Sequence, residues 1–207
     1  MYLPAHFREE SREVLHAFMQ EYPLAALITQ GEGGMDANHI PLLLDAEAGV
    51  LRGHLARSNP QWQSATPGAE ALAIFHGPSS YISPNWYPTK QETGRVVPTW
   101  NYTAVHVRGE LTVYAEPERL LAFLRDLTAA HEATVNGDTK PWQPEDAPAE
   151  YIAGQLRAIV GIELRITGIE GKWKVSQNQP AANREGAAEA LDRLGRGNMS
   201  HLIRNQR

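Results

Sequence analysis

The residues best suited to chemistry lie together in residues 53–62, which read Gly-His-Leu-Ala-Arg-Ser-Asn-Pro-Gln-Trp. Asn59 is a favourable helix N-cap and Pro60 a favourable first helical residue, so a strand that ends near Ala56 should be followed by a helix. Helix N-termini carry unpaired N–H groups that attract anions. Arg57 adds a forked cation and Ser58 a hydroxyl donor, and the segment therefore predicts a phosphate site. A simple cap beside a solvated arginine would have the same sequence.

Two further segments carry groups that could bind a ligand. Residues 81–90 and 98–102 hold five of the sixteen aromatic residues, interleaved with Pro, Asn and Ser, which favours a loop. Such a loop could form a platform for a planar ligand or a partner subunit, or pack onto the domain. Residues 170–180 hold two of the four lysines, a tryptophan and three amide side chains, after a predicted strand. These donors suit a phosphate or the edge of a flavin, although a solvated turn would look the same.

Several kinds of chemistry have no support in the sequence. There is no cysteine, which excludes disulfides and thiolate metal sites, and the eight histidines lack metal-ligand spacing. Gly-x-Ser-x-Gly is absent, so hydrolysis has no support. The glycines at 31–34 lack the third glycine of a dinucleotide loop, because position 36 is Asp36, and they predict a hairpin turn. No apolar run reaches fifteen residues and the N-terminus does not resemble a secretory signal, which predicts a cytoplasmic protein without a membrane span.

The arrangement of elements favours a β-barrel decorated by helices. The length of 207 residues predicts one domain, residues 1–207, with a helical C-terminal extension at about 181–207. Most of the predicted strands precede the helices, and the strands are short and punctuated by glycine turns. The predicted strands are 24–29, 39–44, 50–55, 71–76, 105–114 and 161–169. The predicted helices are 9–22, 117–132, 149–159, 181–194 and 199–205, and residues 136–148 read as a surface loop.

Charge gives little support for nucleic-acid binding. The formal net charge is -5, which argues against wrapping by nucleic acid over the whole surface. The tail from Arg193 to Arg207 carries four arginines and no acid. It could contact a phosphate backbone, or form a frayed helical terminus.

Taken together, the segments resemble the PaiB-type family of FMN-binding negative transcriptional regulators, which are similar to the flavin-binding split barrels of pyridoxamine-phosphate oxidases. The tryptophan-rich segments are the most specific to that family. The stretches that carry the resemblance are Met1-Tyr2 with Pro4 and Phe7, residues 37–42, 53–62, 81–87, 97–102 and 171–178.

The resemblance implies an α+β, mainly β fold: a six-stranded antiparallel split β-barrel decorated by helices. It further implies a homodimer with two FMN molecules at the subunit interface. Arg57, Ser58 and Asn59 would hold the phosphate, with His54 on the strand that leads to them. Other residues are expected near the cofactor on the resemblance alone: Trp100 and Asn101 in one segment, and Lys172 and Gln177 in a segment that reaches the partner's flavin.

Three functions are compatible with this resemblance. The first is a flavin-binding dimer that represses transcription, although the sequence has no helix-turn-helix signature and only the arginine tail favours DNA. The second is an FMN-dependent oxidoreductase acting on a small molecule. The third is a haem-handling protein, although no histidine stands out as an axial ligand. Because FMN supplies redox chemistry itself, either flavin function would explain the missing acid–base pair.

Overall fold

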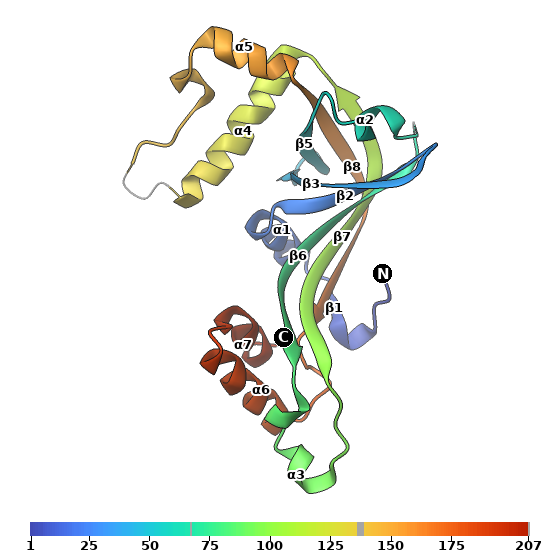
Figure 1. Ribbon diagram of the computed structural model, residues 1–207, viewed down its shortest axis with the longest axis vertical. Coiled ribbons are helices and arrows are strands. Elements are labelled where there is room, and N and C mark those ends of the chain that lie inside the picture. The colour runs from blue at the N-terminus through green and yellow to red at the C-terminus, as the bar shows by residue number, and fades with distance from the viewer. Residues whose placement is uncertain (67, 136–138, 207) are drawn as a thin grey trace. The chain divides into compact units, whose positions relative to one another are not determined.

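The computed structural model describes residues 1–66, 68–135 and 139–206 of the chain. In this part the chain is α+β, with a single antiparallel sheet and seven α-helices (Figure 1). The sheet has eight strands in the order β3-β2-β6-β7-β8-β5-β4, with β1 paired to β8. The expected count of six strands is not confirmed, because two very short strands, β1 and β4, join the sheet as well. The antiparallel, helix-decorated architecture agrees with the expectation.

The described strands and helices follow the sequence pattern closely. The strands are β1 (Arg8–Glu9), β2 (Leu24–Gly31), β3 (Gly34–Pro41), β4 (Leu43–Asp45), β5 (Val50–Ala56), β6 (Glu70–Ile82), β7 (Thr99–Tyr114) and β8 (Ile159–Lys174). The helices are α1 (Arg12–Glu21), α2 (Gln61–Ser64), α3 (Thr89–Thr93), α4 (Pro117–Val135), α5 (Ala149–Arg157), α6 (Ala181–Arg193) and α7 (Gly197–Arg204). Short 3-10 turns occur at Ala5–Phe7, Pro84–Trp86 and Pro144–Asp146. Residues 136–138 of the expected surface loop lie outside the described residues.

The chain divides into two compact units, and β6, β7 and β8 have residues in both. Unit 1 comprises Met1–Tyr22, Ile74–His106 and Ile169–Arg207. Unit 2 comprises Pro23–Ala73 and Val107–Gly168.

Unit 2 contains the β2–β3 hairpin predicted from its glycines. The two strands pair from Leu24 with Pro41 to Gly31 with Gly34, and Gly34 has a φ of 104°, a conformation that favours glycine. Strand β5 pairs with both β4 and the first half of β8. Helices α4 (yellow in Figure 1) and α5 (orange) pack together through Leu120 and Leu156.

In unit 1, helix α1 lies very close to the sheet at two glycines. A Cβ on Gly77 of β6 would lie 2.6 Å from the Phe18 ring, and one on Gly171 of β8 would lie 2.2 Å from Leu15 Cδ2. Phe18 and Leu15 belong to the apolar face of α1, which the sequence pattern predicts. The helix begins after Ser11, whose Oγ accepts from the Val14 N–H, so it is shorter than the expected 9–22.

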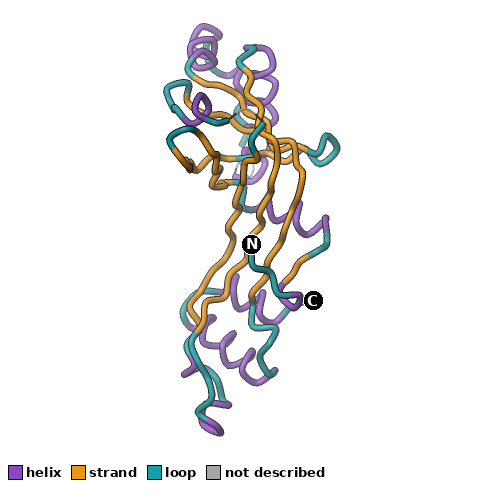
Figure 2. Tube along the Cα trace, turned by 90° about the vertical axis from the view of Figure 1, so that its right-hand side faces the viewer, coloured by secondary structure: helices purple, strands orange, loops and turns teal. Residues whose placement is uncertain are grey.

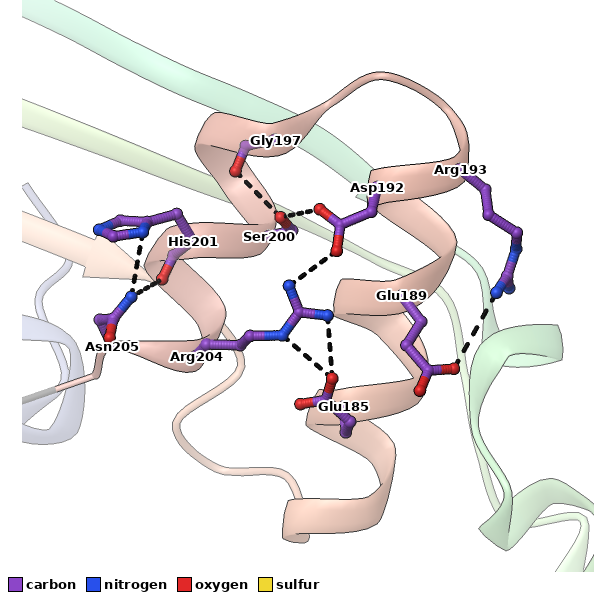
Figure 3. A network of polar contacts seen from close by, with 9 residues as sticks. All are labelled: Glu185, Glu189, Asp192, Arg193, Gly197, Ser200, His201, Arg204 and Asn205. Carbon is purple, nitrogen blue, oxygen red and sulfur yellow. Dashed lines mark hydrogen bonds and ion pairs between the residues drawn. The ribbon is translucent and has the colours of Figure 1, made fainter.

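Helices α6 and α7 of unit 1 follow one another and pack side by side (Figures 1 and 2). Their buried side chains Leu191, Met199 and Ile203 form one cluster with Ile82 and Tyr87. Polar contacts add to this packing, as Figure 3 shows. Arg204 of α7 donates to Glu185 at 2.9 Å and to Asp192 at 2.7 Å, both on α6.

Two segments that the sequence pattern placed in loops or after a strand lie within strands. Trp100 and Asn101 fall in β7, which begins at Thr99, and Lys172 falls in β8, which ends at Lys174. The reason is that polar residues occupy buried positions in β7: Asn101 and Thr103 are both 0% exposed. An alternation in which polar side chains point inward hides the strand from a hydrophobicity pattern.

Candidate functional site

The turn between β5 and α2 forms as the sequence predicts. Strand β5 ends at Ala56, and the Asn59 N–H donates to the Ala56 carbonyl at 2.9 Å. The Asn59 Oδ1 then accepts from the Gln61 N–H at 2.9 Å, while Pro60 has helical dihedral angles. The Asn59 side chain therefore satisfies an otherwise unpaired donor at the start of the helix. The helix begins at Gln61 with Pro60 as its N-cap, one residue later than the sequence predicts.

Arg57 is held in one orientation by the backbone that begins β8. Its Nε donates to the Arg157 carbonyl at 2.8 Å, and its Nη2 donates to the Ile159 carbonyl at 3.0 Å. Its own N–H donates to the Ala158 carbonyl at 2.8 Å. The side chain is nevertheless exposed. Its Nη1 forms no hydrogen bond within the described part of the chain, so an oriented cation with free donors faces outward.

Ser58 completes the donor set of this turn. It is exposed and makes no hydrogen bond with any described residue. No acidic residue occurs in residues 53–62. The oriented guanidinium, the Ser58 hydroxyl and the Asn59 side-chain Nδ2, which makes no hydrogen bond with a described residue, form a donor set without a competing carboxylate. This is the chemistry that a phosphate requires.

Sequence reasoning missed the residues that brace this turn. Gln61 is 0% exposed, and its Nε2 donates to the Leu27 carbonyl at 3.0 Å while its Oε1 accepts from Asn38 at 3.0 Å. These bonds tie α2 to the β2–β3 hairpin. The Trp62 indole N–H donates to the Arg57 carbonyl at 3.0 Å. Arg157 was missed as well. Its carbonyl accepts from the Arg57 side chain, which lies one hundred residues earlier, and no rule of sequence spacing predicts such a contact.

His54 is half-buried in β5 and packs under α4. Its ring centroid lies 6.1 Å from that of Phe123. Its Nδ1 is buried and has no hydrogen-bond partner within the described residues. Burial lowers the pKa of His54, since a protonated ring loses hydration there. Arg52, two residues earlier on the same face of β5, reaches Asp126 of α4 at 3.2 Å.

In unit 1, Asn101 and Gln177 meet the same short turn after β8. The Asn101 Nδ2 donates to Ser176 Oγ at 2.8 Å, while the Asn101 Oδ1 is buried and has no partner among described residues. The Gln177 Oε1 accepts from the Val175 N–H at 2.9 Å, and its Nε2 donates to the Trp173 carbonyl at 2.6 Å. Both polar atoms of the Gln177 side chain are thus used to hold the turn. The Asn101 Oδ1, by contrast, could still accept a hydrogen bond.

Lys172 and Trp100 are placed very differently from each other. Lys172 is 7% exposed, donates to the Tyr2 carbonyl at 2.9 Å, and lies 5.3 Å from the centroid of the Tyr102 ring. Trp100 is 57% exposed and packs edge-on against Tyr81 at 6.1 Å. The predicted residues therefore form two groups: residues 54–59 in unit 2, and Trp100, Asn101, Lys172 and Gln177 in unit 1.

The described part of the chain shows neither a metal-binding cluster nor a membrane-spanning helix. No group of three or more histidine, aspartate or glutamate side chains is arranged to hold a metal ion there. None of the described helices is long and apolar enough to cross a bilayer.

Comparison with known proteins places the chain in a family. Residues 1–168 match the family described as "Putative FMN-binding domain". A Bacillus subtilis relative, named protease synthase and sporulation protein PAI 2, is 30% identical over 181 residues, covering 86% of this chain and 83% of the relative. The chain belongs to the PaiB-type family of FMN-binding proteins.

Relatives of the PaiB-type chain extend to fungi. An uncharacterized Aspergillus fumigatus protein is 35% identical over 240 aligned residues, covering 94% of this chain and 92% of the relative. Solved structures show the same split-barrel-like fold at low identity. The FAD and heme binding protein of Mycobacterium smegmatis has a TM-score of 0.56 and 17% identity, covering 81% of this chain and 73% of that one. A conserved hypothetical protein of Mycobacterium tuberculosis has a TM-score of 0.60 and 12% identity, covering 87% and 94%.

Membership of the PaiB-type family supports FMN, or a related flavin, as the cofactor of this chain. The β5–α2 turn fits the phosphate end of such a cofactor, because Arg57 is already oriented and Ser58 has no other partner. In unit 1, the unpaired Asn101 Oδ1 is a hydrogen-bond acceptor of the kind that the ring N–H of a flavin requires. Bound FMN would supply one- or two-electron redox chemistry, while the chain provides binding and orientation.

Proposed function

We propose that the protein is a cytoplasmic, homodimeric FMN-binding regulator of the PaiB type. In this proposal Arg57, Ser58 and Asn59 bind the phosphate of FMN, and His54 supports the strand that carries them. The observation that carries the proposal is the orientation of Arg57 by two backbone carbonyls, at 2.8 and 3.0 Å. Those bonds fix a cation whose remaining donors face outward. Most of the side-chain entropy that ligand binding would otherwise cost is therefore already lost in the free protein.

The proposed dimer is supported by aromatic surface in unit 1. Trp100 is 57% exposed and its neighbour Tyr81 is 41% exposed, which leaves two large rings in contact with water. Exposed aromatic pairs of this kind are typical of surfaces that associate. In the proposal a second copy covers them. Trp100, Asn101, Lys172 and Gln177 then lie near the flavin ring, with Lys172 and Gln177 reaching the cofactor of the partner.

The proposed regulatory role draws on the Bacillus subtilis relative, whose name is protease synthase and sporulation protein PAI 2. Direct contact of the C-terminal arginines with DNA receives little support. Arg204 is paired with Glu185 and Asp192, and Arg196 donates to Ser80 at 2.8 Å. An arginine already paired with carboxylates has less to gain from phosphate. We therefore infer that the flavin-bound dimer acts through another protein or through a different surface.

An FMN-dependent oxidoreductase is the second candidate. A pocket of about 210 Å³ in unit 2 borders Trp62, the residue whose indole donates to the Arg57 carbonyl. This volume is below the range of about 300–1,000 Å³ that is usual for small-molecule sites, so the pocket suits only a very small substrate.

The cofactor and the dimer are tested together on the purified protein. We expect a flavin absorbance spectrum after incubation with FMN, one FMN released per chain on denaturation, and a solution mass twice the 22.9 kDa of one chain. A Soret band in place of the flavin spectrum, or a monomer that takes up no FMN, would contradict the proposal. Rapid bleaching of the bound flavin by NADH or NADPH would favour the oxidoreductase over the regulator.

A further inference from the structure

Unit 1 contains a pocket that the proposed function does not use. It has a volume of about 570 Å³ and is formed by α1 (blue in Figure 1), α7 (dark red) and residues of β6, β7 and β8. We call it the α1–α7 pocket. Its volume falls within the range of about 300–1,000 Å³ that is usual for small-molecule sites. Part of its wall lies beyond the FMN-binding family match, which ends at residue 168: Trp173, Asn198, His201 and Leu202.

Helix α1 presents two rows of side chains to this pocket. Glu13 and Glu21, eight residues apart, lie on one face, and Phe18 and Tyr22 lie beside them. The Phe18 ring packs 4.9 Å from Tyr22 and 5.0 Å from Trp173, so three aromatic rings form a continuous wall.

The acidic side chains that line this pocket outnumber the basic ones. Glu13 and Glu21 contribute carboxylates, His201 is the one basic side chain among the described lining residues, and neither glutamate is ion-paired with a residue that the structure describes. Tyr22 donates to Glu21 Oε1 at 2.8 Å, and burial together with this bond raises the pKa of Tyr22 to about 12. Tyr22 therefore stays protonated and keeps donating to Glu21 Oε1, which leaves Glu21 Oε2 for a ligand.

The inner side of this pocket is closely packed. Thr103 is 0% exposed, and a Cβ on Gly77 would lie 2.6 Å from both Thr103 Oγ1 and the Phe18 ring. The Thr103 hydroxyl is therefore enclosed by the protein, and the accessible wall consists of the aromatic rings and the carboxylates.

From this geometry we propose that the α1–α7 pocket binds a small organic ammonium ion with an apolar, ring-sized body. The aromatic wall receives the body and attracts the positive charge through the ring faces. One carboxylate, that of Glu13 or that of Glu21, pairs with the ammonium group, because the two lie about 12 Å apart along α1. This site is independent of the FMN site of the proposed function.

The test uses three probes of similar size and different charge on the full-length, FMN-loaded protein. These are 2-phenylethylammonium, neutral 2-phenylethanol and anionic 3-phenylpropanoate, titrated while the indole N–H signal of Trp173 is followed by NMR. We expect saturable binding of the ammonium ion, about threefold or more weaker binding of the alcohol, and about tenfold or more weaker binding of the carboxylate. Equal affinity for all three, or no saturation, would overturn the proposal.

Two variants test whether Glu13 and Glu21 cause the preference for the ammonium ion. The double substitution Glu13→Gln and Glu21→Gln, at two exposed positions, should weaken ammonium binding about three- to tenfold and leave alcohol binding unchanged. Glu47→Gln, an exposed carboxylate of unit 2, is the matched control and should change neither. An unchanged ammonium affinity in the double variant would overturn the assignment. FMN uptake should be equal in all three proteins, and displacement of the amine by FMN would instead place the pocket in the flavin site.

Discussion

At the scale of single residues, His54 makes the stability of the fold depend on pH. Burial lowers the pKa of His54 in the folded state below the unfolded value of about 6.5. Between those two values the unfolded chain binds more protons than the folded chain does. Stability therefore falls as pH drops from neutral through about 6.5 towards the folded pKa, and is recovered as pH rises.

We expect the substitution His54→Gln to flatten this part of the pH profile. The measurement is the free energy of unfolding in urea at pH values between 7.5 and 5. His39→Gln, at an exposed position of β3, is the control and should keep the wild-type slope. A His54→Gln profile as steep as that of the wild type would show that another group carries the dependence.

The site residues differ in how far their sequence reveals them. The bond from the Gln61 N–H to the Asn59 side chain follows from local rules, because the two residues are only two positions apart. The orientation of Arg57 depends on carbonyls at 157 and 159, and the support of α2 depends on Gln61 reaching Leu27. Those contacts are non-local, so no pattern within the segment could predict them.

At the scale of elements, the contact between α6 and α7 rests partly on charge (Figure 3). Asp192 accepts from Ser200 and from Arg204, and these bonds lower the pKa of Asp192. A lowered carboxylate pKa adds stability above the unfolded value of about 4, and that stability is lost as pH falls through the folded pKa.

We expect Arg204→Ala to loosen α7 without unfolding the rest of the protein. Its amide hydrogens in α7 should exchange faster than in the wild type, because two carboxylates on α6 lose their partner. High salt should reduce the difference, since these side chains are exposed. Arg193→Ala, whose nearest carboxylate is 4.0 Å away, is the control. Equal exchange in both variants would indicate that apolar packing alone holds α7.

A second element-level prediction concerns the pairing of β7 and β8. A Cβ on Gly161 would lie 2.2 Å from the Tyr114 ring. Gly161→Ala should therefore destabilise the protein by about 1–3 kcal/mol, as overpacking does, measured by urea unfolding. Gly168→Ala is the control, because nothing lies within 4 Å of its Cβ position. Equal stability of the two variants would contradict the close contact.

Most elements could be predicted, and the early start of β7 shows why part of one was missed. The helix at 117–135 and the hairpin at 24–41 follow the apolar period and the turn glycines. The start of β7 did not follow, because Asn101 and Thr103 occupy inward positions where the pattern expects apolar residues. Buried polar residues of this kind occur where function competes with regular packing.

For the whole molecule, the proposed function requires that the protein holds FMN by its phosphate. If it is, the protein should distinguish FMN from riboflavin, which has the same ring and no phosphate. The preference should vanish when the oriented cation is removed, whereas interactions with the ring should survive.

The most direct test is therefore a calorimetric titration of FMN and of riboflavin into the wild type and into Arg57→Ala. We predict that the wild type binds FMN about tenfold or more tightly than riboflavin. Arg57→Ala should lose about 1.5–3 kcal/mol of FMN affinity, the value of a charged hydrogen bond, with riboflavin affinity unchanged. Equal affinity of the wild type for both flavins, or an equal loss of both in the variant, would contradict phosphate binding at the β5–α2 turn.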